Sequence, residues 1–165
     1  MPSRPAQPGP AVARDGHVTV GRHAEPLREV NLADAPVRHK LSFLRGLPLL
    51  GGLERAYKRL RMKQWHYASV ALPRHFVGCV AFDAGYIGVG FAYVVDRETG
   101  VAHEWSTLIP GARGVFIAPS SVQGASGVAR EGFGEVRFDY TSEGARSLEI
   151  DVAGRGHTLR ASASP

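Results

Sequence analysis

The chain has 165 residues and a mass of 17.7 kDa, the size of one domain, and 44% of its residues are hydrophobic. Residues 1–63 hold 12 Lys/Arg against 5 Asp/Glu, a net charge of +7, whereas residues 64–165 hold 8 against 10, a net charge of −2. The apolar runs are shorter than the about 20 residues of a membrane-spanning helix, and a single cysteine excludes both an internal disulfide and a cysteine-based zinc site.

The N-terminal part of the chain is broken by prolines. Residues 1–16 hold four prolines among small and polar residues, which predicts a disordered tail. Residues 17–62 hold three more, so we expect an irregular leader with one short strand at His17–Val20 and one short helix.

The helix is predicted over residues 53–62. Its apolar residues recur at i, i+3, i+4 and i+7 on one face, and they are Leu53, Ala56, Tyr57 and Leu60. The simplest interpretation is a basic helix that packs on a sheet through this apolar stripe. Because residues 55–63 carry five positive charges, an alternative is a binding module for anionic lipid or nucleic acid, although no nucleic-acid motif accompanies the helix.

From residue 65 the hydrophobic period changes to two, which is typical of β-strands. The first four predicted strands are Trp65–Leu72, Phe76–Phe82, Tyr86–Val95 and Val101–Leu108. A short strand at Val115–Ala118 and a loop of small residues at 119–127 precede the strands Glu135–Tyr140, Ser147–Val152 and His157–Ala161. Strands this closely spaced, joined by glycine-containing turns, predict an all-β, mainly antiparallel domain over residues 63–161, either a barrel or a half-barrel.

Several short motifs follow one another in a fixed order along this domain. They are Lys63–Tyr67, Phe82–Gly88, Phe91–Asp96, Glu98–Gly100 and Pro119–Ser121, preceded by Asn31-Leu32 and Pro36. In order and pattern the chain after residue 28 resembles the bacterial domain of unknown function 2804 family. Members of that family usually carry a basic residue where this chain has Gln64.

The resemblance implies a lipocalin-like fold, because the family is similar at fold level to the lipocalin-like proteins that include carotenoid hydratases and tocopherol cyclases. Those are antiparallel β proteins that handle apolar molecules. The resemblance also implies that this chain matches the N-terminal half of a longer architecture. We therefore expect a domain that binds an apolar small molecule or packs against a second β domain, by self-association or with another chain, unless the chain is truncated.

Five aromatic residues of the predicted β domain are the candidate ligand-binding residues: Trp65, Tyr67, Tyr86, Tyr93 and Trp105. Such side chains combine a large apolar body with a polar tip, so they either fill a β core or line a pocket. Core filling is the simpler interpretation, and in a barrel the two roles are compatible.

Three polar residues are candidates for acid–base chemistry: Asp83, His103 and Glu104. Neighbouring residues on a strand face opposite sides, so His103 and Glu104 cannot share a face, and exposure to solvent is their simpler interpretation. By analogy with the lipocalin-like enzymes, the alternative is a cofactor-free hydratase, cyclase or isomerase acting on an apolar substrate. That alternative requires at least two of the three residues to converge in one cavity.

Other kinds of site are not expected. The glycines at 85–90 lack the dinucleotide-binding order and a following helix, so Gly88 and Gly90 are predicted to make room for close packing. The seven histidines show no metal-ligand spacing, and no nucleophile elbow is present, so we expect neither a metal nor a cofactor. Cys79 is predicted to be a small buried hydrophobe. With one cysteine and no secretory signal, the expected location is the cytoplasm.

Overall fold

The structure is a computed structural model that describes residues 9–13, 17–21, 27, 29–31, 35, 43, 50–120, 122–154 and 156–164. Within these residues the chain forms one helix followed by nine strands. They are α1 (Gly51–Arg61), β1 (Gln64–Ala71), β2 (His75–Asp83), β3 (Ile87–Asp96), β4 (Ala102–Pro110), β5 (Val115–Phe116), β6 (Gly124–Arg130), β7 (Gly134–Tyr140), β8 (Arg146–Gly154) and β9 (His157–Ala163).

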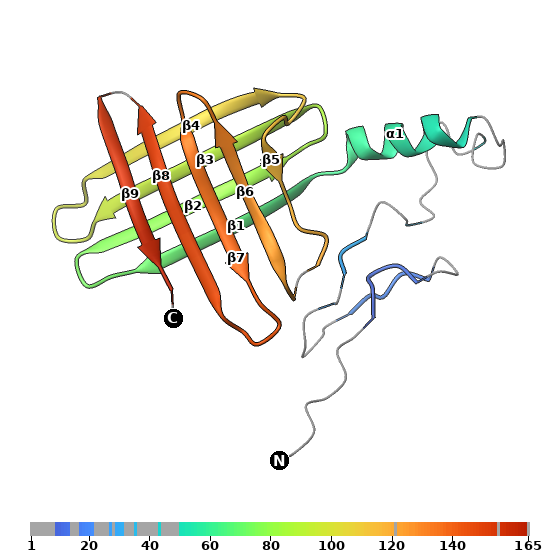
Figure 1. The fold of residues 1–165 in the computed structure, drawn as a ribbon, viewed down its shortest axis with the longest axis horizontal. Helices are drawn as coiled ribbons and strands as arrows, with labels where there is room; N and C mark the ends of the chain where they lie inside the picture. Colours follow the sequence, from blue (N-terminus) through green and yellow to red (C-terminus); the bar gives the residue numbers. More distant parts are fainter. Residues whose placement is uncertain are drawn as a thin grey trace, which may run out of the picture.

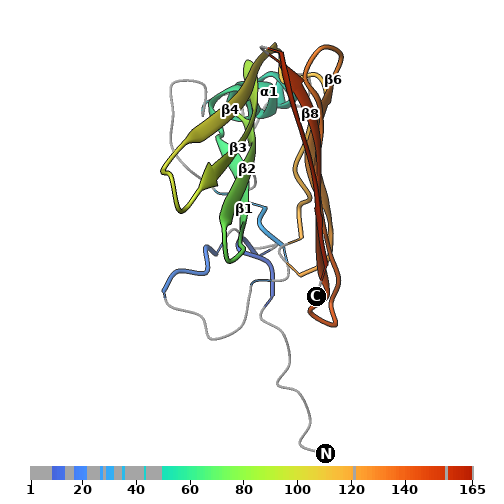
Figure 2. The same cartoon turned by 90° about the vertical axis from the view of Figure 1, so that its left-hand side faces the viewer.

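The strands form two antiparallel sheets that pack face to face. The first sheet has the order β1-β2-β3-β4 and the second has the order β5-β6-β7-β8-β9, so every strand pairs with its neighbour in sequence. Figure 1 shows the strands of the second sheet crossing steeply over those of the first, and Figure 2 shows the two layers on edge. This arrangement confirms the predicted all-β, antiparallel class. Among the described residues the two sheets do not close into one barrel, which leaves the half-barrel of the two predicted forms.

The core lies between the sheets and is asymmetric. The first sheet contributes mainly small inward-facing side chains, such as Cys79, Ala81 and Ala92, all of them fully buried. The second sheet contributes bulkier ones, namely Val128, Val136, Phe138, Leu148, Ile150 and Val152. Because small residues face large ones, the two layers pack closely in this core.

Two glycines of β3 allow this close approach. A Cβ atom at Gly90 would lie 2.8 Å from the Val128 side chain and 2.9 Å from the Phe133 ring. A Cβ atom at Gly88 would lie 2.5 Å from the Val115 side chain. The predicted structural role of these glycines is therefore confirmed, since β5 and β6 occupy the space that side chains would need.

The sheets are joined along β4. Trp105 of β4 is buried between the layers, and its indole Nε1 donates a hydrogen bond to the backbone oxygen of His157 at 3.1 Å. This contact ties the edge strand of the first sheet to the β8–β9 hairpin. In Figure 2 the layers meet on the β4 side, and β1 lies at the opposite edge of its sheet.

The predicted strands match the observed ones to within two residues at most ends, with one exception. Residues 119–127 were expected to form a loop, but β6 begins at Gly124 and pairs with β7 along its whole length. This strand could not be recognised from the sequence, because its residues are mostly small rather than β-branched. They are small of necessity, since a Cβ atom at Gly127 would collide with the backbone of β7 and the Phe116 ring.

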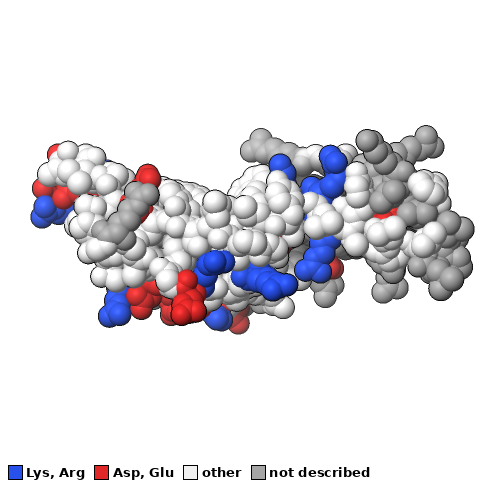
Figure 3. Space-filling view, turned by 90° about the horizontal axis from the view of Figure 1, so that it is seen from above, with Lys and Arg blue, Asp and Glu red and all other residues white. Residues whose placement is uncertain are grey.

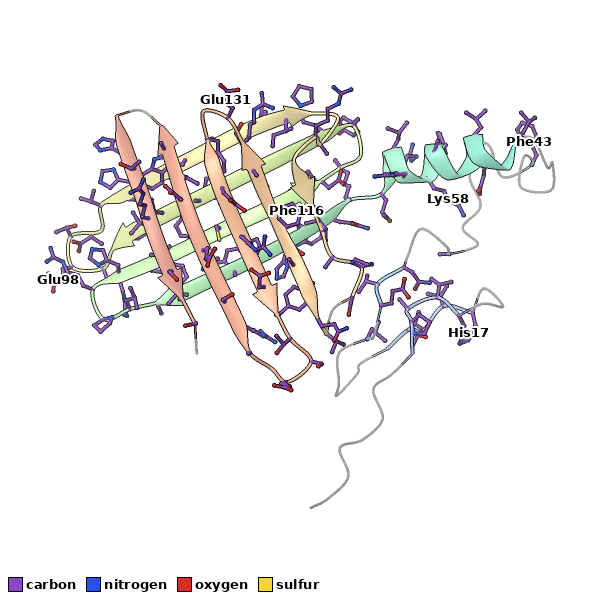
Figure 4. All side chains as sticks on the ribbon, viewed as in Figure 1. His17, Phe43, Lys58, Glu98, Phe116 and Glu131 are labelled. Carbon is purple, nitrogen blue, oxygen red and sulfur yellow. The ribbon has the colours of Figure 1, made fainter. Side chains whose placement is uncertain are left out.

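Helix α1 forms where it is predicted, but its apolar stripe does not pack on the sheets. Leu53 and Leu60 are 54% and 51% exposed, whereas Glu54 is buried and its carboxylate lies 3.3 Å from the ammonium of Lys58. Lys58 points toward the N-terminal segment (Figure 4) and donates to the backbone oxygen of Ala35 at 3.1 Å. The helix extends beyond the sheets (Figure 1), and basic side chains gather where it meets them (Figure 3).

The N-terminal region is described only in part. Of the tail predicted over residues 1–16, residues 1–8 and 14–16 lie outside the described residues. Val12 is buried and forms an isolated bridge with Val18, so a bridge takes the place of the strand predicted at His17–Val20. The side-chain amide of Asn31 pairs with both backbone groups of Val12, at 2.8 and 2.9 Å.

Candidate ligand-binding cleft

A cleft of about 1140 Å³ lies between β1 and the second sheet. We call the contact between Trp105 of β4 and the β8–β9 hairpin the seam. The seam holds the layers together on the β4 side, and the cleft lies on the other side, beneath β1. Its far wall consists of β7, β8, the end of β9 and the segment that links β5 to β6. The cleft is open to solvent, so a ligand can enter without the sheets separating.

The interior of the cleft is mostly apolar. The inward face of β1 presents Gln64, His66, Ala68 and Val70, which alternate with exposed residues along the strand. Opposite them lie Ile117, Phe138, Tyr140, Leu148 and Ala163. An apolar cavity with a few convergent polar groups is the usual form of a small-molecule site.

His66 is the central polar group on the β1 wall. Its ring stacks on Phe138, with the ring centres 4.5 Å apart and the planes at 8°, and it meets the edge of Tyr140 at 5.4 Å. Burial lowers the pKa of His66, and the positive charge of Arg146 lowers that pKa further. The imidazole is therefore neutral at pH 7 and forms part of an aromatic wall.

Hydrogen bonds fix the opposite wall. Ser126 is fully buried, and its hydroxyl oxygen accepts a hydrogen bond from the Ala118 backbone at 3.0 Å. The Tyr140 hydroxyl donates to the Ser120 backbone oxygen at 2.8 Å. The Val30 backbone donates to the Pro119 oxygen at 2.7 Å, so the N-terminal segment also supports this wall. Because these groups are already paired, the apolar surface is held in place before any ligand arrives.

The five predicted ligand-binding aromatics do not gather in the cleft. Trp65 and Tyr67 border it through the backbone of β1, but their side chains lie on the opposite face of the first sheet. There the Tyr67 and Tyr93 hydroxyls lie 3.0 Å apart, and burial, followed by this hydrogen bond, raises the pKa of Tyr93 to about 12. Tyr86 is exposed in the β2–β3 turn, and Trp105 fills the seam.

The three candidate acid–base residues are also separated, and none of them lines the cleft. Asp83 ends β2, where its Oδ1 accepts a hydrogen bond from the Gly85 backbone at 2.6 Å and so stabilises the turn. His103 and Glu104 are exposed on opposite faces of β4. Cys79 is buried as predicted, and burial raises the pKa of its thiol to about 12.

The residues that do line the cleft carried a signal in the sequence. The period-two pattern at 64–71 separates two faces, so once Trp65 and Tyr67 lie outside, His66 and Ala68 must lie inside. Hydrophobicity alone would instead place Trp65 and Tyr67 inside and His66 outside. Phe138 and Tyr140 follow the same alternation on β7, but only the pairing of the sheets places them opposite His66.

The outward face of the first sheet is the second unusual surface. We call it the outer apolar face and define it by Trp65, Tyr67, Phe76, Val80, Phe82, Ile87, Val89, Phe91, Tyr93, Val95 and Leu108. Glu104 is the only charged residue among the outward positions of β1–β4. Trp65 and Leu108 are 67% and 64% exposed, and no described element covers this face.

Fold and site together define a class of protein: a two-sheet antiparallel β domain with an apolar cleft that opens beneath one edge strand. The chain belongs to the family described as Domain of unknown function (DUF2804), whose model matches residues 4–164. No protein with a curated description and no solved structure matches the chain. In the part of the chain that the structure describes, no helix has the length and apolar character needed to cross a membrane.

Proposed function

We propose that this chain is a lipocalin-like binding protein that holds an apolar small molecule in the cleft beneath β1. The observation that carries the proposal is the apolar interior between His66 and Ala68 of β1 on one side and Ile117, Phe138 and Leu148 on the other. Its volume of about 1140 Å³ is of the size that small-molecule sites occupy. We retain the cytoplasm as the proposed location, on the basis of the single, buried cysteine.

The cleft has the features of a site rather than of a packing fault. The core between the sheets is complete without it, with Val128, Val136 and Val152 fully buried. The polar groups at its rim are satisfied, and no described buried side-chain polar atom lacks a partner. A preformed apolar surface binds an apolar ligand with little ordering cost.

The test is the binding of N-phenyl-1-naphthylamine, an uncharged probe whose fluorescence rises in apolar surroundings. We expect saturable binding by the wild-type chain. Ala163→Trp, on the cleft side of β9, should abolish it by filling the cleft, whereas Ser162→Trp, on the other face of the same strand, should not. Absence of saturable binding, or equal binding by both variants, would overturn the proposal.

A second function, association through the outer apolar face, is favoured by a separate observation. Eleven apolar or aromatic side chains cover this face with only Glu104 charged among them. Soluble monomers rarely expose contiguous apolar patches of more than a few hundred square ångströms. We propose that the face packs against the same face of a second copy of the chain.

The area suits a symmetric dimer. Strands of 8 to 10 residues, at about 3.3 Å per residue and about 4.8 Å between strands, cover roughly 550 Å² per copy. Two copies therefore bury about 1,100 Å², which meets the roughly 1,000 Å² that a specific interface requires. A second copy also suits the lack of charge on this face. In a symmetric dimer the face packs against an identical face, so apolar side chains contact apolar side chains.

Sedimentation velocity tests the dimer. The wild-type chain should sediment as a dimer at micromolar concentration, and the double variant Trp65→Lys with Leu108→Lys should sediment as a monomer. Leu53→Lys with Leu60→Lys is the matched control, since these equally exposed leucines lie on α1. A monomeric wild type, or a dimer that survives the first pair of lysines, would rule out this interface.

The two remaining hypotheses stay predictions from the sequence. Catalysis by Asp83, His103 and Glu104 gains no support from the described residues, where none of the three lines the cleft. Among the described side chains, binding to anionic surfaces through residues 55–63 would rely on Arg59, Arg61 and Lys63, because Lys58 already pairs with Glu54.

A further inference from the structure

We propose that the ligand of the cleft is an amphiphile, with an apolar chain between the sheets and an anionic head group bound by Arg146. This inference rests on the proposed binding function and specifies the chemical class of the ligand. It follows from the distribution of charge around an otherwise apolar cavity.

Arg146 is placed to receive an anion. It begins β8 on the same face as Leu148, Ile150 and Val152, which point into the core, and its register partner is Tyr140 of the cleft wall. The arginine side chain is therefore the last member of an inward-facing column and lies where that column reaches solvent. Among the described residues Arg146 forms no ion pair, so its guanidinium has donors to spare for a ligand.

The acidic residues near the cleft do not compete for this position. Of the acidic residues that the structure describes, only Asp139 borders the cleft, and Arg137 holds its carboxylate through two hydrogen bonds of 2.7 and 2.9 Å. Glu143, in the β7–β8 turn, does not line the cleft and forms no ion pair with Arg146. Lys63, immediately before β1, adds a second positive charge to the border. The ionised side chains left available are thus positive.

The positive charge also reaches the interior. Arg146 opposes protonation of His66, so its field extends to the aromatic wall where the apolar part of a ligand would lie. A cationic ligand head would meet the same repulsion. The hydroxyl of an uncharged ligand could accept a hydrogen bond from the guanidinium, whereas an anion would gain a stronger one between opposite charges.

The experiment compares four ligands that share a ten-carbon chain: decanoate, decyl phosphate, decanol and decylamine. Each displaces N-phenyl-1-naphthylamine from the wild-type chain at pH 7.5. We expect the anions to bind about tenfold more tightly than decanol, as one charge-assisted hydrogen bond implies, and decylamine to bind most weakly. Comparison of decanoate with decyl phosphate distinguishes a carboxylate from a phosphate head.

Three variants assign the effect to Arg146. Arg146→Gln should lose about tenfold in decanoate affinity with decanol unchanged, and Arg146→Lys should recover part of that loss. Arg160→Gln is the matched control, because Arg160 pairs with Asp151 on the solvent face of the same sheet, and it should bind like the wild type. Circular dichroism checks that each variant is folded.

The outcomes separate this inference from the proposed function. If the probe binds but decanoate and decanol displace it equally, the cleft is a ligand site without head-group recognition and the inference is wrong. If Arg146→Gln weakens decanol as much as decanoate, the arginine acts through its apolar stem and the inference is also wrong. If neither the probe nor any decyl compound binds, both proposals fail together.

Discussion

The outward faces of the two sheets differ in kind. The second sheet turns charged residues to solvent, including the ion pairs Arg137–Asp139 at 2.7 Å and Arg160–Asp151 at 3.1 Å. The first sheet turns aromatic and β-branched side chains outward, with Glu104 as its single charge. Both sheets bury one face in the same core, so the difference between them lies in the residues on their outward faces.

An antiparallel sheet with one wet face normally alternates apolar residues inside with polar residues outside. The second sheet follows this rule, since Leu148, Ile150 and Val152 alternate with Glu149 and Asp151. The first sheet departs from it, because both of its faces are apolar. Its inner face holds mainly small residues, apart from Trp105 and Ile109, and its outer face holds large ones. The difference teaches that hydrophobicity does not distinguish the two faces of the first sheet, and that small side chains mark the buried face of β2 and β3.

The largest expected effect is the loss of Trp105. Trp105→Ala should lower the free energy of unfolding by about 3–5 kcal/mol, because it empties the seam and leaves the His157 oxygen without its donor. Trp65→Ala, on the outer face of the same sheet, should cost about 0.5 kcal/mol or less in dilute solution. Urea denaturation measures both, and equal losses would erase the distinction between the two faces.

A methyl group added to each face should have a smaller effect. Gly90→Ala should destabilise the chain by about 1–3 kcal/mol, because its Cβ would press on Val128 and Phe133 inside the core. Gly78→Ala meets the Tyr93 ring at 2.5–2.6 Å on the outer face, where that ring can move toward solvent. Thermal unfolding should therefore rank Gly90→Ala well below Gly78→Ala, and the reverse order would contradict the assignment of faces.

His66, on the cleft side of the first sheet, should make the free energy of unfolding depend on pH. Its pKa is lowered in the folded chain, so just below the unfolded value of about 6.5 the folded state holds fewer protons than the unfolded state. The free energy of unfolding should therefore fall as the pH drops through that window. His66→Phe should flatten this dependence, whereas replacement of the exposed His103 by Phe should retain it; denaturation at pH 5.5 and 7.5 compares them.

The smallest effect is expected on the charged face of the second sheet. Asp151→Asn breaks an exposed pair with Arg160 and should change the free energy of unfolding by about 0.5 kcal/mol or less. The change should shrink further in 0.5 M salt, because exposed charges are screened. A loss of several kcal/mol in the denaturation midpoint analysis would show that this face is not simply solvated.

Most of the fold could be predicted from the sequence, because alternation and turn glycines are local signals. The strand around Ser147–Val152 stands out by period two alone, and the one around Phe76–Phe82 stands out as a continuous apolar run between turns. Strand β6 was not predicted because its small residues, such as Ser126 and Gly127, are required by close contacts with β7 and Phe116. Those contacts are made in the folded chain and leave no local pattern in the sequence. A strand selected for tight packing lacks the β-branched residues by which strands are recognised.

The candidate site was harder to predict, for a physical reason. Alternation in β1 correctly grouped Trp65 with Tyr67, but it cannot say which group faces the second sheet. That choice depends on the bulk of Phe138 and Leu148 across the core, which favours small partners such as Ala68. The importance of Arg146 depends on its register opposite Tyr140, a relation that only the paired strands establish.

The two tryptophans make the chain its own spectroscopic reporter. Trp105 is 5% exposed at the seam and Trp65 is 67% exposed on the outer apolar face, and the chain has no others. Their emission should differ in wavelength and in access to a quencher such as iodide. The exposed Trp65 should emit at the longer wavelength and the buried Trp105 at the shorter one. A titration that protects the Trp65 emission from the quencher reports contact at the outer apolar face, and one that shifts the Trp105 emission reports opening of the seam. Binding, association and unfolding can thus be followed separately without attaching a label.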